Sequence, residues 1–198
     1  LWEGSIAHHL VNALPAGTLF RIASSMPIRD VDSFSVDSGR TLRVSSNRGV
    51  NGIDGTIATT LGAAAVHPGP ISLLTGDLST LHDIGALLTA PRPARPVLIT
   101  VVDNGGGGIF GFLPMRDHPT AFKPWYVTPH SHDIAAVGRA MSVQTFSPTS
   151  LAECHEAWRV GLETPGVTLV HIRVDRQQST DRHFDAWAAV DDALQVPS

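Results

Sequence analysis

The chain has 198 residues, of which 42% are hydrophobic and 16% are charged, and this composition fits one globular α/β domain with a sizeable core. Its formal net charge is −4 and Lys123 is its only lysine, so it lacks the clustered cations that bind nucleic acid. No apolar run is long enough for a membrane span, no signal peptide is recognisable, and the single cysteine, Cys154, excludes an internal disulfide, so we expect a cytoplasmic protein.

Apolar runs alternate with helical patterns along the chain, which predicts strands that alternate with helices. Strands are expected over residues 18–23, 41–45, 71–75, 97–102, 143–146 and 168–174. Helices are expected over residues 6–14, 24–31, 53–66, 78–88, 131–141, 151–163 and 181–194, and a long loop over residues 103–130. This alternation implies parallel strands joined by right-handed crossovers, so the expected fold class is a doubly wound α/β domain, with a mostly parallel sheet and helices on both faces.

Two loops at the predicted carboxyl ends of strands combine glycines with metal-binding side chains. Asp77 follows Gly76 after the third strand, and Asn104 precedes a run of four glycines after the fourth. In open parallel sheets, ligands bind beyond these strand ends. Carboxylate, amide and carbonyl oxygens are the ligands that Mg²⁺ prefers, and the ion would offset the charge of a diphosphate in a net-acidic domain. Either loop alone is more typical of an ordinary turn or flexible loop than of a cofactor site, and the lysine and glycine motifs of ATP and NAD sites are absent.

The interval between the two loops distinguishes a cofactor site from two unrelated turns. Asn104 lies 27 positions after Asp77, with one helix and one strand predicted between them. This resembles the signature of thiamine-diphosphate enzymes, which begins with Gly-Asp and ends with an asparagine. Leu78 stands where the signature normally has a further glycine, and this departure is typical of the 2-succinyl-5-enolpyruvyl-6-hydroxy-3-cyclohexene-1-carboxylate synthase family. Blocks that resemble this family lie at residues 24–30, 46–55, 76–83 and 107–114.

The resemblance implies that residues 1–198 form a single diphosphate-binding domain cut from a longer, multi-domain protein. It implies thiamine diphosphate and Mg²⁺ (or Mn²⁺) as cofactors and 2-oxoglutarate and isochorismate as substrates. The enzyme would be a transferase of menaquinone biosynthesis, which decarboxylates 2-oxoglutarate and adds the succinyl-semialdehyde carbanion to isochorismate. The activating glutamate would lie on a pyrimidine-binding domain of the same protein, from a second subunit of a homo-oligomer. We therefore expect no catalytic residue in this fragment and no turnover by it alone.

The resemblance also implies roles for individual residues. Arg29 and Arg48 would pair with substrate carboxylates, which guanidinium groups bind bidentately, and Ser25 and Phe110 would contact the same substrates. Ser25 is equally suited to cap a helix. The metal ligands would be Asp77, Asn104 and Gly106. The cofactor-binding residues would be Ile53, Gly76, Asp77, Leu78, Ser79, Asn104, Gly106, Gly107, Ile109 and Phe110.

Two other functions remain open: a different thiamine-diphosphate decarboxylase or lyase, and a non-catalytic α/β module that has kept the fold. Arg29, Arg48 and the block at 52–55 argue against the first, whereas Asp77 and Asn104 argue against the second. The spacing of histidines and aspartate at 130–133 is too loose for a zinc site, so His130 is interpreted as a loop residue before a capped helix.

Two further features are interpreted as packing rather than chemistry. Cys154 falls on a predicted helix, where a lone cysteine usually packs in the core. An apolar stripe on the last predicted helix, which includes Phe184, Trp187 and Leu194, predicts core or subunit packing. Asp103 is not expected to bind the metal, because the proposed ligands already include a carboxylate.

Overall fold

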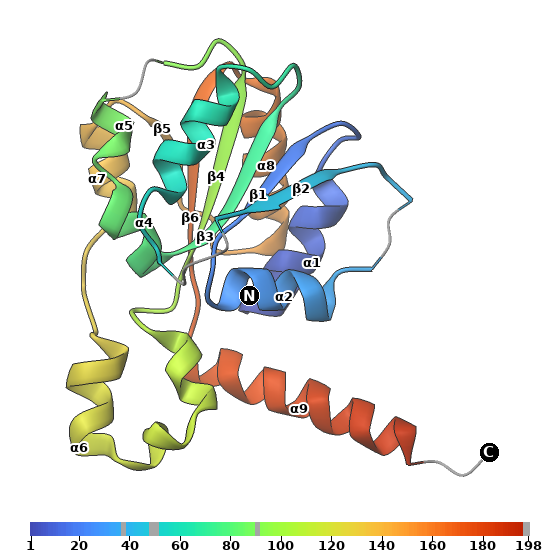
Figure 1. Cartoon of the computed structure of the whole chain (residues 1–198), viewed down its shortest axis with the longest axis vertical. Coiled ribbons are helices and arrows are strands. Elements are labelled where there is room, and N and C mark those ends of the chain that lie inside the picture. Colours follow the sequence, from blue (N-terminus) through green and yellow to red (C-terminus); the bar gives the residue numbers. More distant parts are fainter. Residues whose placement is uncertain (37–38, 48–51, 90–91, 196–198) are drawn as a thin grey trace.

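The computed structural model describes residues 1–36, 39–47, 52–89 and 92–195. A six-stranded sheet in the order β2-β1-β3-β4-β6-β5 forms its centre, and every adjacent pair of strands is parallel (Figure 1). The strands are β1 (Leu19–Ile22), β2 (Arg43–Ser46), β3 (Ile71–Gly76), β4 (Pro96–Asp103), β5 (Gln144–Phe146) and β6 (Gly166–Arg173). The predicted fold class, a doubly wound parallel sheet, is confirmed.

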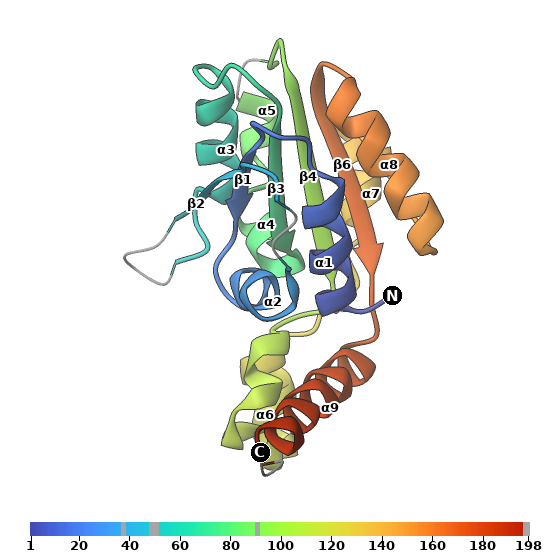
Figure 2. The same cartoon turned by 90° about the vertical axis from the view of Figure 1, so that its right-hand side faces the viewer.

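Helices connect the strands and cover both faces of the sheet (Figure 2). The α-helices are α1 (Glu3–Ala13), α2 (Met26–Phe34), α3 (Thr56–Ala64), α4 (Asp77–Asp83), α5 (Ala86–Thr89), α6 (Pro119–Phe122), α7 (Ile134–Ala140), α8 (Leu151–Glu163) and α9 (Arg176–Leu194). Short 3₁₀ segments η1 (Gly108–Phe112) and η2 (Pro114–Asp117) and a π-helical turn η3 (Lys123–Val127) lie between β4 and α7. Among the described residues, no helix combines the length and apolar character needed to cross a bilayer.

Each face of the sheet carries its own hydrophobic core. Successive strand residues point to opposite faces, so Leu73 joins one core and Leu74 the other. Helices α1 and α8 close the first core, which contains the fully buried Trp158 and Cys154. Helices α3 and α7 close the second core. Cys154 is therefore a packing residue, as predicted, and burial raises the pKa of its thiol to about 11.

The strand order fixes where a ligand can approach. The chain passes from β1 to β2 on one side and then returns to β3 on the other, so β1 and β3 are neighbours at the point where the winding reverses. In doubly wound sheets this reversal leaves a crevice beyond the carboxyl ends of the strands. The loops that follow β1, β3 and β4 meet at that edge of the sheet.

Three segments differ most from the prediction. The single helix expected over 78–88 is divided at Ile84 and Gly85 into α4 and α5. The expected loop over 103–130 contains the short segments η1, η2, α6 and η3. Helix α9 begins at Arg176 rather than at Asp181, because the side chain of Asp175 caps it by accepting a hydrogen bond from Gln178 N–H.

The apolar stripe of α9 does not pack into the core of this chain. Phe184 is 36% exposed, Trp187 44% and Leu194 80%. Helix α9 projects beyond the edge of the sheet, where it contacts η1 (Figures 1 and 2). The prediction that these side chains pack in the core is wrong, and packing against another subunit stays a prediction.

Candidate active site

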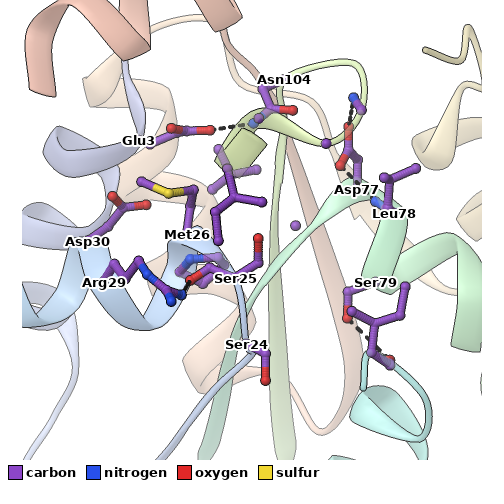
Figure 3. Close-up of a pocket in the computed structure, with 18 of the residues that line it drawn as sticks. Glu3, Ser24, Ser25, Met26, Arg29, Asp30, Asp77, Leu78, Ser79 and Asn104 are labelled. Atoms are coloured by element: carbon purple, nitrogen blue, oxygen red, sulfur yellow. Dashed lines mark hydrogen bonds between the residues drawn. The ribbon is translucent and has the colours of Figure 1, made fainter. Parts of the chain in front are cut away.

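One pocket of about 420 Å³ lies at the carboxyl ends of β1, β3 and β4 (Figure 3). Every predicted site residue that the structure describes lines this pocket. These are Ser25, Arg29, Ile53, Gly76, Asp77, Leu78, Ser79, Asn104, Gly106, Gly107, Ile109 and Phe110. Arg48 lies outside the described residues. Segments that are far apart in the sequence are therefore brought to one cavity by the parallel sheet.

Asp77 is the buried carboxylate of the pocket, with 3% of its surface exposed. Its Oδ1 accepts a hydrogen bond from Leu78 N–H at 2.7 Å, and its Oδ2 accepts one from Gly106 N–H at 2.7 Å. The second contact joins the loop after β3 to the loop after β4. Burial, together with the neighbouring carboxylate of Asp103, raises the pKa of Asp77 to about 6, although the two N–H groups favour the ionised form.

His130 also contacts Asp77. Its Nε2 lies 3.1 Å from Asp77 Oδ2, and its side chain is only 8% exposed. Nδ1 of the same ring accepts a hydrogen bond from the His132 N–H, so Nε2 carries the hydrogen that is donated to Asp77. His130 is thus more than the loop residue that the sequence predicted. No local pattern marks it, because the partner lies 53 positions away.

Asp103 faces the interior of the loop after β4. Its Oδ1 accepts from Gly105 N–H at 2.9 Å, and its Oδ2 lies 2.7 Å from His171 Nε2. Burial by itself would raise the pKa of Asp103, but the hydrogen bonds from His171 and Gly105 lower it to about 2. Both oxygens of Asp103 therefore have hydrogen-bond partners within the protein.

The glycine run allows the loop after β4 to pack closely against the segment near Val127. Gly106 has a φ of 138°, and a Cβ built there would lie 2.2 Å from the carbonyl oxygen of Val127. Gly107 N–H donates to that same carbonyl at 2.7 Å. The Gly106 carbonyl accepts from Gly108 N–H at 3.0 Å and keeps a second lone pair for another partner.

Asn104 presents an unused oxygen. Its Nδ2 donates to Glu3 Oε1 at 2.5 Å, whereas its Oδ1 is buried and has no partner among the described residues. A buried amide oxygen without a partner is costly, so a missing ligand is the natural explanation. A divalent cation would satisfy this oxygen together with the Asp77 carboxylate. The residues present therefore fit a metal ion. Glu3, which contacts Asn104, was not predicted as part of the site.

Three predicted residues contribute to the apolar lining of the pocket. Ile53 lies before α3, and its carbonyl is held by Thr56 Oγ1 at 3.0 Å and Ser79 Oγ at 3.4 Å. Ile109 and Phe110 lie on η1, where the Phe110 ring packs edge-on against Tyr126 with centroids 5.5 Å apart. Ser79 thus ties α4 to the turn that carries Ile53.

The segment after β1 supplies the polar side opposite Asp77. Ser25 occupies the N-cap position of α2 with a φ of 73°, but its side chain makes no capping hydrogen bond. The alternative reading of its hydroxyl as a helix cap is therefore wrong. Arg29 is exposed at the pocket and donates to the Ser25 carbonyl at 2.7 Å. Ser24, which was not predicted to take part, has a buried Oγ without a partner among the described residues.

Comparison with known proteins agrees with this geometry. Residues 33–172 match the family "Thiamine pyrophosphate enzyme, C-terminal TPP binding domain". The chain is 43% identical over 193 residues to the 2-succinyl-5-enolpyruvyl-6-hydroxy-3-cyclohexene-1-carboxylate synthase of Myxococcus xanthus, a match that covers 95% of this chain and 32% of that protein. It is 38% identical to the synthase of the same name from Chloroflexus aurantiacus, over 97% of this chain and 32% of that protein. The resemblance predicted from the sequence is thereby confirmed.

A solved structure shows the same fold. Benzoylformate decarboxylase from Polynucleobacter necessarius superposes with a TM-score of 0.69 at 19% identity, over 89% of this chain and 33% of that one. The chain spans about a third of the length of the curated relatives it matches. Since the family match extends over most of the sequence, the chain belongs to the C-terminal thiamine pyrophosphate-binding domains of the thiamine pyrophosphate enzymes.

Proposed function

We propose that this chain is the diphosphate- and metal-binding domain of a cytoplasmic 2-succinyl-5-enolpyruvyl-6-hydroxy-3-cyclohexene-1-carboxylate synthase. The whole enzyme would decarboxylate 2-oxoglutarate and join the resulting four-carbon unit to isochorismate in menaquinone biosynthesis. The observation that carries the proposal is the meeting of the Asp77 carboxylate and the unpartnered Asn104 oxygen in one pocket. The similarity to synthases of that name supports the choice of substrates.

In this proposal, Asp77, Asn104 and the carbonyl of Gly106 hold Mg²⁺ or Mn²⁺. The diphosphate would be held by Gly76, Leu78, Ser79 and Gly107, which share the wall of the pocket with the metal ligands. The metal is required because a polyanion would otherwise face the buried Asp77 carboxylate. Thiamine diphosphate supplies the carbon nucleophile and the electron sink that decarboxylation needs.

The chain's own residues position the substrates. Arg29 binds a carboxylate of 2-oxoglutarate, and its hydrogen bond to the Ser25 carbonyl directs the guanidinium towards the pocket. The Ser25 hydroxyl, which is not used as a cap, donates to the same substrate. Ile53, Ile109 and Phe110 exclude water from the reacting carbon, which strengthens the charge interactions around it. Arg48 is proposed as the second carboxylate-binding arginine.

The remainder of the active site lies elsewhere in the proposed enzyme. A pyrimidine-binding domain from a second subunit of a homo-oligomer supplies the activating glutamate and covers the pocket. Residues 1–198 act as the single diphosphate-binding domain and do not turn over 2-oxoglutarate by themselves. A different thiamine-diphosphate decarboxylase or lyase is the alternative, and the likeness to benzoylformate decarboxylase does not favour it, because at 19% identity it reflects the fold.

The direct test uses the full-length protein with 2-oxoglutarate, isochorismate, thiamine diphosphate and Mg²⁺. The Asp77→Asn variant keeps the size of the side chain but loses the anionic ligand, so turnover and Mg²⁺-dependent cofactor binding should fall by at least about 100-fold. Glu163→Gln, the same change from carboxylate to amide at an exposed site on α8, should leave both unchanged. Full activity of Asp77→Asn would refute the proposed metal site, and release of CO₂ without consumption of isochorismate would favour the alternative enzyme.

A further inference from the structure

Glu3 makes a contact with the site that no sequence pattern indicates. It begins α1, is only 6% exposed, and lies 101 positions before Asn104. Its Oε1 accepts the hydrogen bond from Asn104 Nδ2 at 2.5 Å (Figure 3). The carboxylate, which also lines the pocket, therefore contacts a proposed metal ligand directly.

This contact decides which end of the Asn104 amide faces the pocket. The two ends of an asparagine amide have nearly the same shape, so rotation by half a turn exchanges Oδ1 and Nδ2. A carboxylate accepts hydrogen bonds and donates none, so only the NH₂ end can face Glu3. Oδ1 is then directed away from Glu3, where it has no partner among the described residues. Without Glu3, the NH₂ end can turn towards a cation and repel it.

A second donor makes a carboxylate, rather than an amide, the matching group at position 3. Ser179 Oγ donates to Glu3 Oε2 at 3.0 Å and accepts from Glu3 N–H at 3.2 Å, so its hydrogen is directed to Oε2. Both oxygens of Glu3 thus face donors. A glutamine in this place would present one NH₂ group, either to Ser179 or to the Asn104 amide.

We propose that Glu3 is a positioning residue that fixes the orientation of Asn104 and so keeps its oxygen available to the metal ion. The inference rests on the proposed function, in which Asn104 is a metal ligand. Removal of a group that orients a metal ligand typically lowers metal affinity by about 10- to 100-fold. We expect a loss of this order when Glu3 is replaced.

The test measures Mn²⁺ affinity in the full-length protein with saturating thiamine diphosphate, by the loss of the free Mn²⁺ signal in electron paramagnetic resonance. Glu3→Gln should weaken Mn²⁺ binding by about 10-fold or more, at a temperature where the variant is folded. Glu163→Gln makes the same chemical change at an exposed site on α8 and should have no effect. Ser179→Ala, which frees the second oxygen of Glu3, should give a smaller loss and serves as an independent variant.

An exchange of the two groups separates orientation from general packing. In the double variant Glu3→Gln with Asn104→Asp, the new amide at position 3 donates to the new carboxylate at position 104 and still accepts from Ser179. A carboxylate has oxygens at both ends, so one oxygen always faces the ion. The double variant should therefore recover at least about half of the Mn²⁺ affinity lost, on a logarithmic scale, in Glu3→Gln.

The outcomes are distinct. Mn²⁺ affinity of Glu3→Gln within about twofold of the unchanged protein would overturn the inference, as would a double variant that binds no better than Glu3→Gln. If Glu3 had only a structural role, Glu3→Gln would lower the unfolding temperature, and the double variant would not recover Mn²⁺ binding. Failure of the unchanged protein to bind Mn²⁺ would overturn the proposed function itself, and with it the role of Glu3.

Discussion

The hydrogen bonds around His183 require a shared proton beneath the pocket. Nδ1 of His183 lies 2.7 Å from the carbonyl oxygen of Ser179, which can only accept, so Nδ1 carries a hydrogen. Nε2 lies 2.7 Å from Asp30 Oδ1, so one further proton lies on His183 or on Asp30. Burial raises the pKa of Asp30 to about 6. Burial opposes the charge on His183, but the hydrogen bonds to Asp30 and Ser179 raise the pKa of its ring overall.

The pair should make stability depend on pH. Both folded-state pKa values lie above the unfolded values, so the folded protein binds more protons, and this stabilisation is lost as pH rises through the folded pKa values. The thermal unfolding midpoint of the full-length protein should fall as pH rises above about 6.5, the ordinary pKa of histidine, more steeply than in a His183→Gln variant. Parallel pH profiles for the two proteins would show that the pair does not hold a proton.

At the scale of elements, the loop after β4 is the part of the site most constrained by its backbone. A Cβ at Gly106 would meet the Val127 carbonyl oxygen at 2.2 Å, and a Cβ at Gly108 would meet Nδ2 of Asn104 at 2.2 Å. The first conflict involves fixed backbone, with a φ of 138° that side chains disfavour. The conflict at Gly108 involves the Asn104 side chain, which can move, but only if its hydrogen bond to Glu3 breaks.

The two glycines should therefore respond differently to alanine. Gly106→Ala should lower both the unfolding temperature and cofactor affinity, because the loop itself must shift. Gly108→Ala should lower Mn²⁺ and cofactor affinity with a smaller loss of stability, because it displaces the Asn104 amide. Gly62→Ala, on the exposed face of α3 with no atom within 4 Å, should be neutral or stabilising by up to about 1 kcal/mol. Calorimetry and cofactor titration would show this, and wild-type behaviour of Gly106→Ala would contradict it.

The buried strands were predictable because short, continuous apolar runs are typical of strands that are covered on both faces. All six lie within two residues of their predicted ends, and α8 begins and ends as predicted. The prediction of a single helix over 78–88 was wrong. The apolar pattern continues across Ile84 and Gly85 and so does not mark the point where the helix is interrupted. The short segments between β4 and α7 were missed because none is longer than 5 residues and three contain a proline in their first turn, which leaves little periodicity to detect.

On the scale of the whole molecule, the site is assembled from segments that only the sheet topology brings together. The loops with Asp77 and Asn104 were predictable as neighbours, because successive parallel strands end at one edge. Glu3 and His130 were not, because their contacts with these loops span 101 and 53 positions and follow no local pattern. The sequence thus indicated many of the residues that line the pocket, but not the two side chains that contact Asp77 and Asn104.

The shape of the molecule also agrees with a domain that works against a partner. Helix α9 and the segment with η1, η2 and α6 extend beyond the carboxyl edge of the sheet, beside the pocket (Figure 1). Phe184 and Trp187 form a partly exposed aromatic cluster with Phe112 there. We expect the pyrimidine-binding domain of the proposed enzyme to pack against this side.

The central claim is that Asp77 and Asn104 share one divalent cation. It is tested most directly by a crystal structure of the full-length protein with thiamine diphosphate and Mn²⁺, in which the anomalous signal locates the ion. The account predicts a single site in the pocket, with the Asp77 carboxylate and the Asn104 amide oxygen each roughly 2 Å from the ion. An ion bound elsewhere, such as between Glu3, Asp30 and His183, or an Asn104 amide nitrogen facing the ion, would contradict it.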